Sequence, residues 1–204
     1  MATMTTDGRR MRGEVSRRAV MRVAVNLASA QGLEGLSIGG LAAKTAMSKG
    51  GVVALFGTKE QLQLATIAAA SEVFRASVIA PALETRGGLE RLRVLIDAWL
   101  RYSETRVFEG GCFFAAAASE LGSQRGAVRD AVAEAMRQWQ EFVRHTITRA
   151  IEQRELPATT DAALLTFEIT SLLDGANSMS LLFDNGEPYG RARDAIGRLL
   201  SPLG

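Results

Sequence analysis

The segment from residue 33 to residue 64 constrains the fold of this chain more than any other. It reads LEGLSIGGLAAKTAMSKGGVVALFGTKEQLQL. Ser37 and Ser48 each precede a short run of apolar residues, at the position where a helix N-cap belongs. The segment therefore predicts two short helices, at about residues 38–44 and 49–56, joined by a tight turn.

Helical patterns flank this segment on both sides. Thr58 and Gln61 form a capping box that opens a long helix over residues 59–79, and Pro81 is expected to end or bend that helix. Upstream, apolar residues recur at helical spacing over residues 14–31. The N-terminal part of the chain therefore predicts three helices followed by a fourth, longer one.

The rest of the chain is also helical in pattern. Further helices are expected at about residues 89–100, 112–121, 127–154, 161–183 and 189–200. Helix-forming Ala, Leu, Arg and Glu dominate, and no strand-length alternation of apolar and polar residues occurs. The sequence predicts an all-α protein of about nine helices.

Charge is distributed unevenly along the chain. Residues 1–60 hold nine Lys or Arg and four Asp or Glu, whereas residues 61–204 hold 15 basic and 18 acidic residues. All three lysines lie between positions 44 and 59. Because residues 1–60 are basic and the rest of the chain is mildly acidic, the N-terminal region is predicted to bind a polyanion.

Two short helices joined by a tight turn are typical of a DNA-reading helix-turn-helix. The second helix of such a pair enters the major groove, and its first turn reaches the edges of the bases. Here that helix opens with SKGG at positions 48–51, where free backbone N–H groups and the positive end of the helix dipole suit phosphate. Thr58 and Lys59, at the start of the next helix, offer a second phosphate-binding site.

These residues resemble the N-terminal domain of the tetracycline-repressor (TetR/AcrR) family. The runs GLEGLSIGGLA, AMSKGGV and LFGTKEQL carry the resemblance, which spans about residues 14–64. It implies a homodimeric repressor with a three-helix DNA-binding domain and a larger, divergent helical domain for ligand binding and dimerisation. The expected division is a flexible basic arm at 1–12, the helix-turn-helix domain at 13–57 and the ligand-binding and dimerisation domain at 58–204.

The chain departs from the family pattern at several positions. The family usually has a polar residue at the position of Gly51, an aromatic residue at Val53 and often His or Tyr at Leu55, and these side chains commonly help to hold the DNA backbone. Ala46 replaces the usual turn glycine. The resemblance therefore implies the docking geometry rather than particular base contacts.

We expect DNA contacts from the caps, the first helical turns and the basic residues near them. These residues are Arg17, Ser37, Lys44, Ser48, Lys49, Gly50, Gly51, Thr58 and Lys59. The arm with Arg9, Arg10 and Arg12 either follows the phosphates or an adjacent minor groove, or is a solvated tail. Both interpretations stay open.

The helices after residue 58 carry aromatic residues that could line a cavity. The candidate ligand-binding residues are Trp99, Tyr102, Phe113, Phe114, Trp139, Phe142, Phe167 and Asn177. Aromatic cavities with few polar groups suit flat apolar ligands, although an ordinary core position is the alternative for each aromatic residue. Asn177 belongs to the set because its amide, in a mostly apolar stretch, needs a partner; Ser103, Glu104, Ser119, Glu120 and Glu168 are weaker polar candidates.

The helix expected at residues 161–183 is apolar on nearly all sides, which is unusual for the surface helix of a monomer. Pairing it and the helix at 189–200 with a second copy would form a four-helix seam. A two-fold dimer would place two reading helices about 34–36 Å apart, the spacing of successive major grooves. A single helix deep in the core is the alternative.

Enzymatic and metal chemistry find little support in the sequence. It lacks a nucleophile elbow, a phosphate-binding loop and an HExxH motif, and it contains one His and one Cys. We expect neither an enzyme nor a metal or other cofactor, and Cys112, in an apolar stretch, is expected to be a buried thiol. No membrane span or secretory signal is apparent, so a cytoplasmic protein without a membrane partner is expected.

These observations together predict a TetR-type transcriptional regulator, a repressor that leaves its double-stranded DNA operator when a small apolar effector binds. The alternative is a DNA-bound scaffold whose C-terminal domain recruits a protein partner. An enclosed cavity would favour the sensor, and an exposed apolar patch away from the dimer seam would favour the scaffold.

Overall fold

The structure is a computed structural model that describes the backbone of residues 4–201 and the side chains of residues 13 and 15–201. Over these residues it is all-α and contains no strand. The elements are α1 (Met4–Gln31), α2 (Ile38–Thr45), α3 (Lys49–Phe56), α4 (Lys59–Phe74), the π-helical stretch η1 (Arg75–Ile79), α5 (Ala80–Leu83), α6 (Gly88–Glu104), α7 (Phe113–Leu121), α8 (Ala127–Glu152), α9 (Ala162–Phe183) and α10 (Glu187–Leu199). Because α4, η1 and α5 follow one another without a break, the described part of the chain contains the nine helices that were expected.

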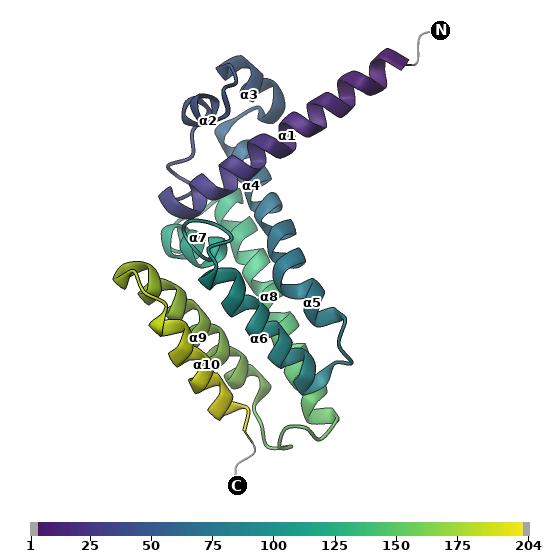
Figure 1. The fold of residues 1–204 in the computed structure, drawn as a ribbon, viewed down its shortest axis with the longest axis vertical. Coiled ribbons are helices and arrows are strands. Elements are labelled where there is room, and N and C mark those ends of the chain that lie inside the picture. Colours follow the sequence, from purple (N-terminus) through teal and green to yellow (C-terminus); the bar gives the residue numbers. More distant parts are fainter. Residues whose placement is uncertain (1–3, 202–204) are drawn as a thin grey trace.

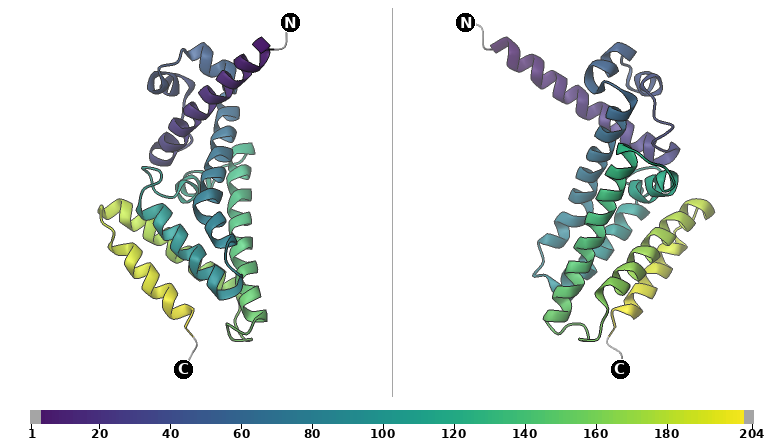
Figure 2. Two further views of the ribbon diagram at one scale, coloured as in Figure 1. Left: turned by 45° about the vertical axis from the view of Figure 1, so that its right-hand side comes forward. Right: turned by 180° about the vertical axis from the view of Figure 1, so that it is seen from behind.

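The molecule is elongated, with a small head at one end and a larger body below it (Figure 1). The head consists of α2 and α3 packed beside α1, and the body consists of long helices that run along the molecule. Helices α9 and α10 form an antiparallel pair along one side of the body, as the view from behind also shows (Figure 2). The first turn of α1 and the last turn of α10 lie at opposite ends of the molecule (Figure 1).

Head and body have separate hydrophobic cores. The small core joins α1, α2, α3 and the start of α4 through Val20, Met21, Ala24, Leu36, Leu41, Ala42, Val52, Phe56 and Leu62. The large core lies among α4–α9 and α10 and includes Trp99 and Tyr189, which are both 1% exposed. Helix α4 contributes to both cores, with Leu62 in the small one and Phe74 in the large one, and α1 does so too, with Ala24 in the small core and Ala28 in the large one. Helices α1 and α4 therefore connect head and body.

The predicted helix caps of the head are confirmed. Ser37 Oγ accepts a hydrogen bond from the backbone N–H of Gly40 at 3.1 Å, and Ser48 Oγ accepts one from Gly51 at 3.0 Å. Thr58 and Gln61 form the reciprocal capping box, at 3.2 and 2.9 Å. These local bonds fix where α2, α3 and α4 begin.

Two helix boundaries differ from expectation. Helix α1 begins at Met4 rather than near residue 14, so the backbone of most of the predicted arm is helical, while the side chains of Arg9, Arg10 and Arg12 lie outside the described residues. Pro81 does not end its helix, which continues to Leu83. Since proline lacks an N–H and crowds the carbonyl one turn earlier, the wider turns of η1 just before it let the helix continue.

The continuous helix Lys59–Leu83 is 25 residues long, with a mean hydropathy of 1.3 in its most apolar window. By length and composition alone it is a candidate membrane span, which the sequence analysis did not foresee. Within the fold its parts contact α1, α6 and α8. This packing is that of a central helix in a helical bundle, which needs apolar residues on more than one side.

Candidate functional sites

The turn between α2 and α3 has the left-handed backbone conformation that such a turn requires. Ala46 adopts it, with φ 53°, and the N–H of Met47 bonds to the carbonyl of Ala42 at 3.1 Å. Glycine tolerates this conformation better than alanine because it has no Cβ. The usual turn glycine is therefore replaced without loss of the turn, at a cost in backbone strain.

Helix α3 presents a narrow, mostly apolar outer face. Val52 and Phe56 are buried in the small core, whereas Lys49, Gly50, Val53 and Ala54 are exposed. Val53 is 46% exposed. Sequence reasoning passed over Val53 as a contact residue, although its position next to inward-facing Val52 placed it on the outer face.

Arg17 makes its contacts within the head. Its guanidinium donates a hydrogen bond to the carbonyl of Leu55 at 2.6 Å and lies 4.7 Å from the centre of the Phe56 ring. A cation at this end of α3 satisfies a terminal carbonyl and complements the helix dipole. Arg17 therefore ties α1 to α3, and its predicted contact with DNA stays a prediction.

Lys59 also binds another residue of the protein, Glu34. Its ammonium donates to the carbonyl of Glu34 at 2.7 Å and lies 3.5 Å from the Glu34 carboxylate. It fixes the start of α4 against the loop between α1 and α2. The exposed Lys49 has no ion pair among the described residues, which leaves its charge available for a phosphate.

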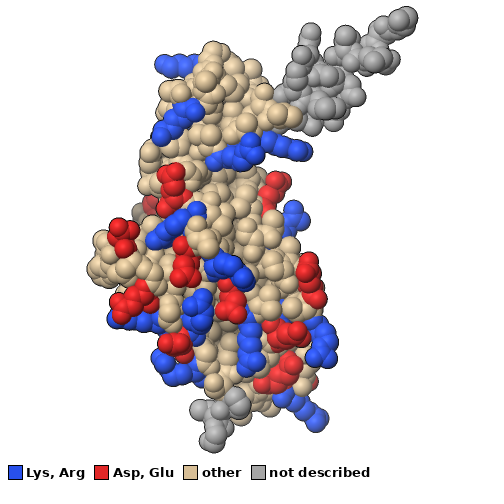
Figure 3. Space-filling model, in the orientation of Figure 1, with Lys and Arg blue, Asp and Glu red and all other residues tan. Residues whose placement is uncertain are grey.

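The charge of the head is visible on the surface. Figure 3 shows Lys and Arg side chains at the end of the molecule formed by α2 and α3, whereas basic and acidic side chains are mixed over the body. This pattern agrees with the charge distribution along the sequence. A basic head suits a polyanionic partner.

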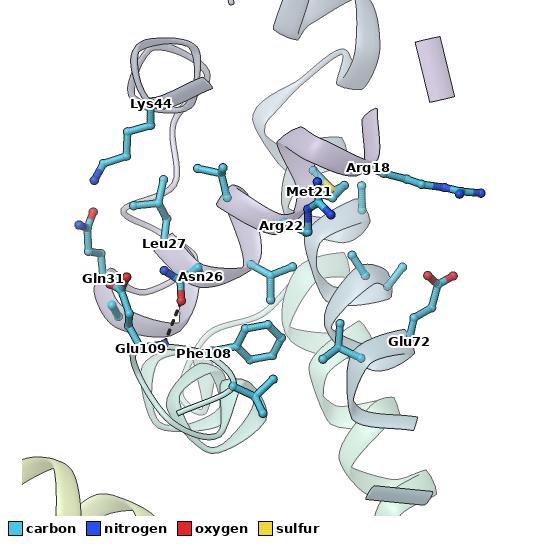
Figure 4. A pocket seen from close by; sticks show the side chains of 18 of the residues that line it. Arg18, Met21, Arg22, Asn26, Leu27, Gln31, Lys44, Glu72, Phe108 and Glu109 are labelled. Atoms are coloured by element: carbon cyan, nitrogen blue, oxygen red, sulfur yellow. Dashed lines mark hydrogen bonds between the residues drawn. The ribbon is translucent and has the colours of Figure 1, made fainter. Parts of the chain in front are cut away.

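An open cleft of about 1350 Å³ separates head and body (Figure 4). Charged residues line much of it, among them Arg18, Arg22, Lys44, Glu72 and Glu109. Lys44, an expected DNA contact, therefore lies at this cleft on α2 rather than on the outer face of α3. We regard the cleft as the junction between the two units, because it is broad, open and lined by charges of both signs.

Hydrogen bonds cross the junction. Asn26 Oδ1 on α1 accepts from the N–H of Glu109 at 2.9 Å (Figure 4), and Ser29 Oγ accepts from the N–H of Gly110 at 3.1 Å. A Cβ at Gly110 would lie 1.9 Å from the Ser29 carbonyl oxygen, so only glycine allows this approach. The loop before α7 is therefore held against α1.

A smaller and more enclosed cavity, of about 330 Å³, lies inside the body. Its aromatic lining consists of Phe74, Trp99, Phe114, Trp139 and Phe142. The Phe74 ring meets the Trp139 ring edge to face at 5.2 Å and the Phe114 ring at 5.9 Å. The volume and the lining are those of a site for a small, largely apolar ligand.

Half of the expected ligand residues reach this cavity. Trp99, Phe114, Trp139 and Phe142 line it, as does Phe74, which sequence reasoning missed. Tyr102 and Phe113 lie in the surrounding core, and Phe167 is 66% exposed on the outer side of α9. Phe167 lies outside this cavity because the buried face of α9 lies along Leu165, Ile169 and Leu173.

Asn177 does not line the cavity, and its side chain is hydrogen-bonded to other parts of the fold. Its Oδ1 accepts from Ser103 Oγ at 2.8 Å and from the backbone N–H of Cys112 at 2.9 Å. Gly111 makes this possible, since it has φ 73° and a Cβ there would lie 2.1 Å from the same oxygen. Asn177 therefore anchors the start of α7 to α9.

The polar network continues towards α10. The Tyr189 hydroxyl lies 2.8 Å from Ser103 Oγ and accepts from Arg106 at 3.2 Å. Arg106 also donates to Ser180 Oγ at 2.7 Å. The network joins α6, α9 and α10 with its buried polar groups satisfied, which favours one fixed arrangement of these helices.

Two ionisable groups line the cavity wall nearest α9. Cys112 is 3% exposed, so the expected buried thiol is confirmed, and burial raises the pKa of this thiol to about 12. Asp174 lies on α9, and burial raises the pKa of its carboxyl group to about 6. Sequence reasoning missed Asp174, although a carboxylate between Leu173 and Gly175 in an apolar helix was a signal of the kind that singled out Asn177.

The outer face of α9 is strongly apolar. Its exposed residues include Leu164, Phe167, Met179, Leu182 and Phe183, and Leu182 is 77% exposed. All of these side chains belong to α9. Exposed apolar area of this kind marks a surface for a protein partner.

A helix-turn-helix head on a helical body with an aromatic-lined cavity defines a class of DNA-binding transcription regulators. Two family models match the chain: "Bacterial regulatory proteins, tetR family" over residues 20–66, and "Tetracyclin repressor-like, C-terminal domain" over residues 88–196. The second match covers more than half of the chain. The chain belongs to the TetR family of transcriptional regulators.

Solved structures show the same fold. A TetR regulator from Chloroflexus aurantiacus J-10-FL is 25% identical, with a TM-score of 0.84 and coverage of 91% of this chain and 94% of that one. A putative regulator from Saccharomonospora viridis in complex with choline is 18% identical, with a TM-score of 0.78 and coverage of 92% and 96%. AibR, solved with isovaleryl coenzyme A and operator DNA, is 19% identical, with a TM-score of 0.73 and coverage of 92% and 100%. No curated protein matches the chain.

Proposed function

We propose that this protein is a cytoplasmic, homodimeric repressor that leaves a palindromic operator when a small, largely apolar effector enters the cavity of about 330 Å³. The observation that carries the proposal is the position of α7. This helix begins at the cavity, which Phe114 and Cys112 line, and ends against the head. A ligand that displaces α7 would therefore displace the reading unit.

The contacts at the two ends of α7 support this route. At its start, the N–H of Cys112 is held by Asn177 of α9, one helical turn from Asp174 in the cavity wall. Near its end, the Glu120 carboxylate accepts from the backbone N–H groups of Leu33 and Glu34 at 2.7 and 2.8 Å. For release to follow, the effector must prefer the arrangement of α7 in which the head does not fit DNA.

The apolar face of α9 supports dimerisation through the last two helices. Residues such as Phe167 and Leu182 would be covered by the same face of a second copy, since a two-fold interface uses one surface twice. The exposed apolar surface is then used by the dimer, and a separate patch for a recruited protein is not needed. The aromatic-lined cavity and solved relatives that hold isovaleryl coenzyme A or choline also favour a sensor over a scaffold.

DNA selection with the purified protein tests the proposal. A pool of random duplexes should yield a palindromic site, and fluorescence anisotropy should show binding that weakens as salt increases. Lys49→Ala should weaken binding and reduce the salt slope by about 1, because one phosphate contact is lost. Arg86, 96% exposed in its side chain at the far end of the body, provides the control, and Arg86→Ala should change neither value.

A protein that selects no site and ignores duplex DNA at low salt would refute the proposal. A selected site from which no apolar compound releases the protein would refute the effector part alone.

A further inference from the structure

The cavity contains a carboxylate for which the protein provides no partner. Asp174 lines the cavity together with Trp99, Cys112, Phe114 and Trp139. Among the described residues, no hydrogen bond or ion pair reaches its side chain, whereas other polar groups on the same side of α9 are satisfied, as Asn177 is. Asp174 is therefore the one acidic group of the cavity wall that faces aromatic surroundings without a donor.

This arrangement is costly for the folded protein. Burial raises the pKa of Asp174 to about 6, and no neighbouring cation lowers it. At neutral pH the carboxylate is thus mostly ionised in a poorly hydrated place. A partly buried charge without a partner destabilises a fold, and the cost is removed when a positive group binds beside it.

The charged residues at the cavity do not supply that positive group. Arg75 lines the cavity but is exposed and forms no ion pair with Asp174. Glu72, from the preceding turn of the same helix, also lines the cavity and opposes the charge of Arg75. The charged lining is therefore negative overall, with its most buried charge on Asp174.

The aromatic residues add a second attraction for a cation. Phe74, Phe114 and Trp139 all line the cavity, and the Phe74 ring packs edge to face against the other two rings. The face of an aromatic ring attracts a cation, and tryptophan does so most strongly. The same rings offer apolar surface for the remainder of a ligand.

We propose that the effector is a monocation, a protonated amine or quaternary ammonium on a compact apolar body, with its nitrogen beside Asp174 and its apolar part among the aromatic rings of the cavity. This inference rests on the proposed function, because it names the chemical class of the effector for the same cavity. It changes the expected ligand from an apolar molecule to an amphiphilic one.

Two probes of nearly equal size and shape test the charge. 1-Naphthylmethylamine is cationic at pH 7.5, and 1-naphthalenemethanol is neutral. Isothermal titration calorimetry with the full-length protein should show that the amine binds at least about tenfold more tightly than the alcohol, because a charged hydrogen bond replaces a neutral one. Asp174→Asn should remove this preference while changing the affinity for the alcohol less than about twofold.

Glu72→Gln provides the matched control. It removes one negative charge from the exposed rim of the same cavity and should leave the preference for the amine intact. Competition by the alcohol should displace the amine from the wild-type protein, which places both probes in one site. Circular dichroism confirms that each variant is folded before titration.

The outcomes separate the inference from the proposed function. Equal binding of amine and alcohol to the wild type would overturn the cationic effector and leave an apolar one. An amine preference that survives Asp174→Asn, or that Glu72→Gln removes equally, would also overturn it. If neither probe binds, the inference fails, whereas the effector part of the proposed function is judged separately by release of the protein from its selected site.

Discussion

Glu120 accepts a hydrogen bond from the backbone N–H of Leu33 at 2.7 Å, although 87 residues separate the two in sequence. The other carboxylate oxygen accepts from Glu34 at 2.8 Å. Gly32, with φ 82°, makes the approach possible, since a Cβ there would lie 2.5 Å from a Glu120 oxygen. One carboxylate thus holds the loop between α1 and α2 against the end of α7.

Removal of this carboxylate should loosen the head from the body. Glu120→Ala is expected to lower the free energy of unfolding by about 1–2 kcal/mol, because two backbone donors lose a charged acceptor. Urea denaturation measures this change. Ser119→Ala, at the exposed preceding position, should change it by less than about 0.5 kcal/mol, and an equal effect of both substitutions would contradict the assignment.

Ala46 offers a place to stabilise the protein. Ala46→Gly should raise the free energy of unfolding by about 0.5–1 kcal/mol, because glycine adopts the left-handed conformation at φ 53° without the strain of a Cβ. Ala43→Gly is the matched control, since Ala43 is exposed within α2. There glycine should destabilise by about 1 kcal/mol. A decrease in stability at both positions in urea denaturation would contradict the prediction.

Val53 should contribute to base recognition through apolar contact. If α3 reads the major groove, an exposed valine is suited to the methyl group of thymine. Replacement of thymine by uracil at the contacted positions of a selected operator should weaken wild-type binding several-fold in anisotropy titrations. Val53→Ala should show a smaller response to the same replacement. An equal response of both proteins would exclude this contact.

The two tyrosines of the large core should respond oppositely to the loss of a hydroxyl group. The buried Tyr102 hydroxyl has no hydrogen-bond partner among the described residues, so Tyr102→Phe should leave the free energy of unfolding unchanged or raise it by up to about 1 kcal/mol. Tyr189→Phe removes contacts with Ser103 and Arg106 and should lower it by about 1–2 kcal/mol. Thermal and urea denaturation of the pair check this contrast.

Asp174 should make the ligand-free protein less stable as pH rises. Its pKa in the folded protein is about 6 against an ordinary value of 3.8, so the folded state binds the proton more tightly than the unfolded state. Stability is therefore lost as pH rises from about 4 to about 6, by at most about 3 kcal/mol for this group. Asp174→Asn should remove this loss and be the more stable protein at pH 7.5, as urea denaturation at pH 4.5 and 7.5 would show. A wild type and variant with parallel pH profiles would contradict the shift.

Local patterns predicted the head well. Ser37, Ser48 and Thr58 cap helices whose starts depend on bonds between residues three positions apart, and sequence shows such pairs directly. The partners of Arg17 and Lys59 were not predicted, because those contacts join segments 38 and 25 residues apart.

The cavity was predicted less well for a physical reason. When a helix has apolar residues on several sides, its sequence does not show which side packs against a neighbouring helix. Trp139 and Phe142, which line the cavity, were therefore predicted together with Phe167, which is exposed. Tyr102 and Phe113 are core residues whose neighbours come from distant parts of the chain. Asp174 was missed because one carboxylate on a helix normally lies in water, and only the packing around α9 shows that it does not.

The sharing of α4 between the two cores limits how this regulator can be recombined with others. Leu62 is fully buried in the small core, yet it lies beyond residue 57, where the sequence suggested that the DNA-binding domain ends. A fragment that ends at residue 57 would lack Leu62 and would leave the small core partly exposed. Chimeras that transplant this reading head onto a foreign sensor should therefore carry the first turns of α4 through Ala69, whose side chain packs against both cores.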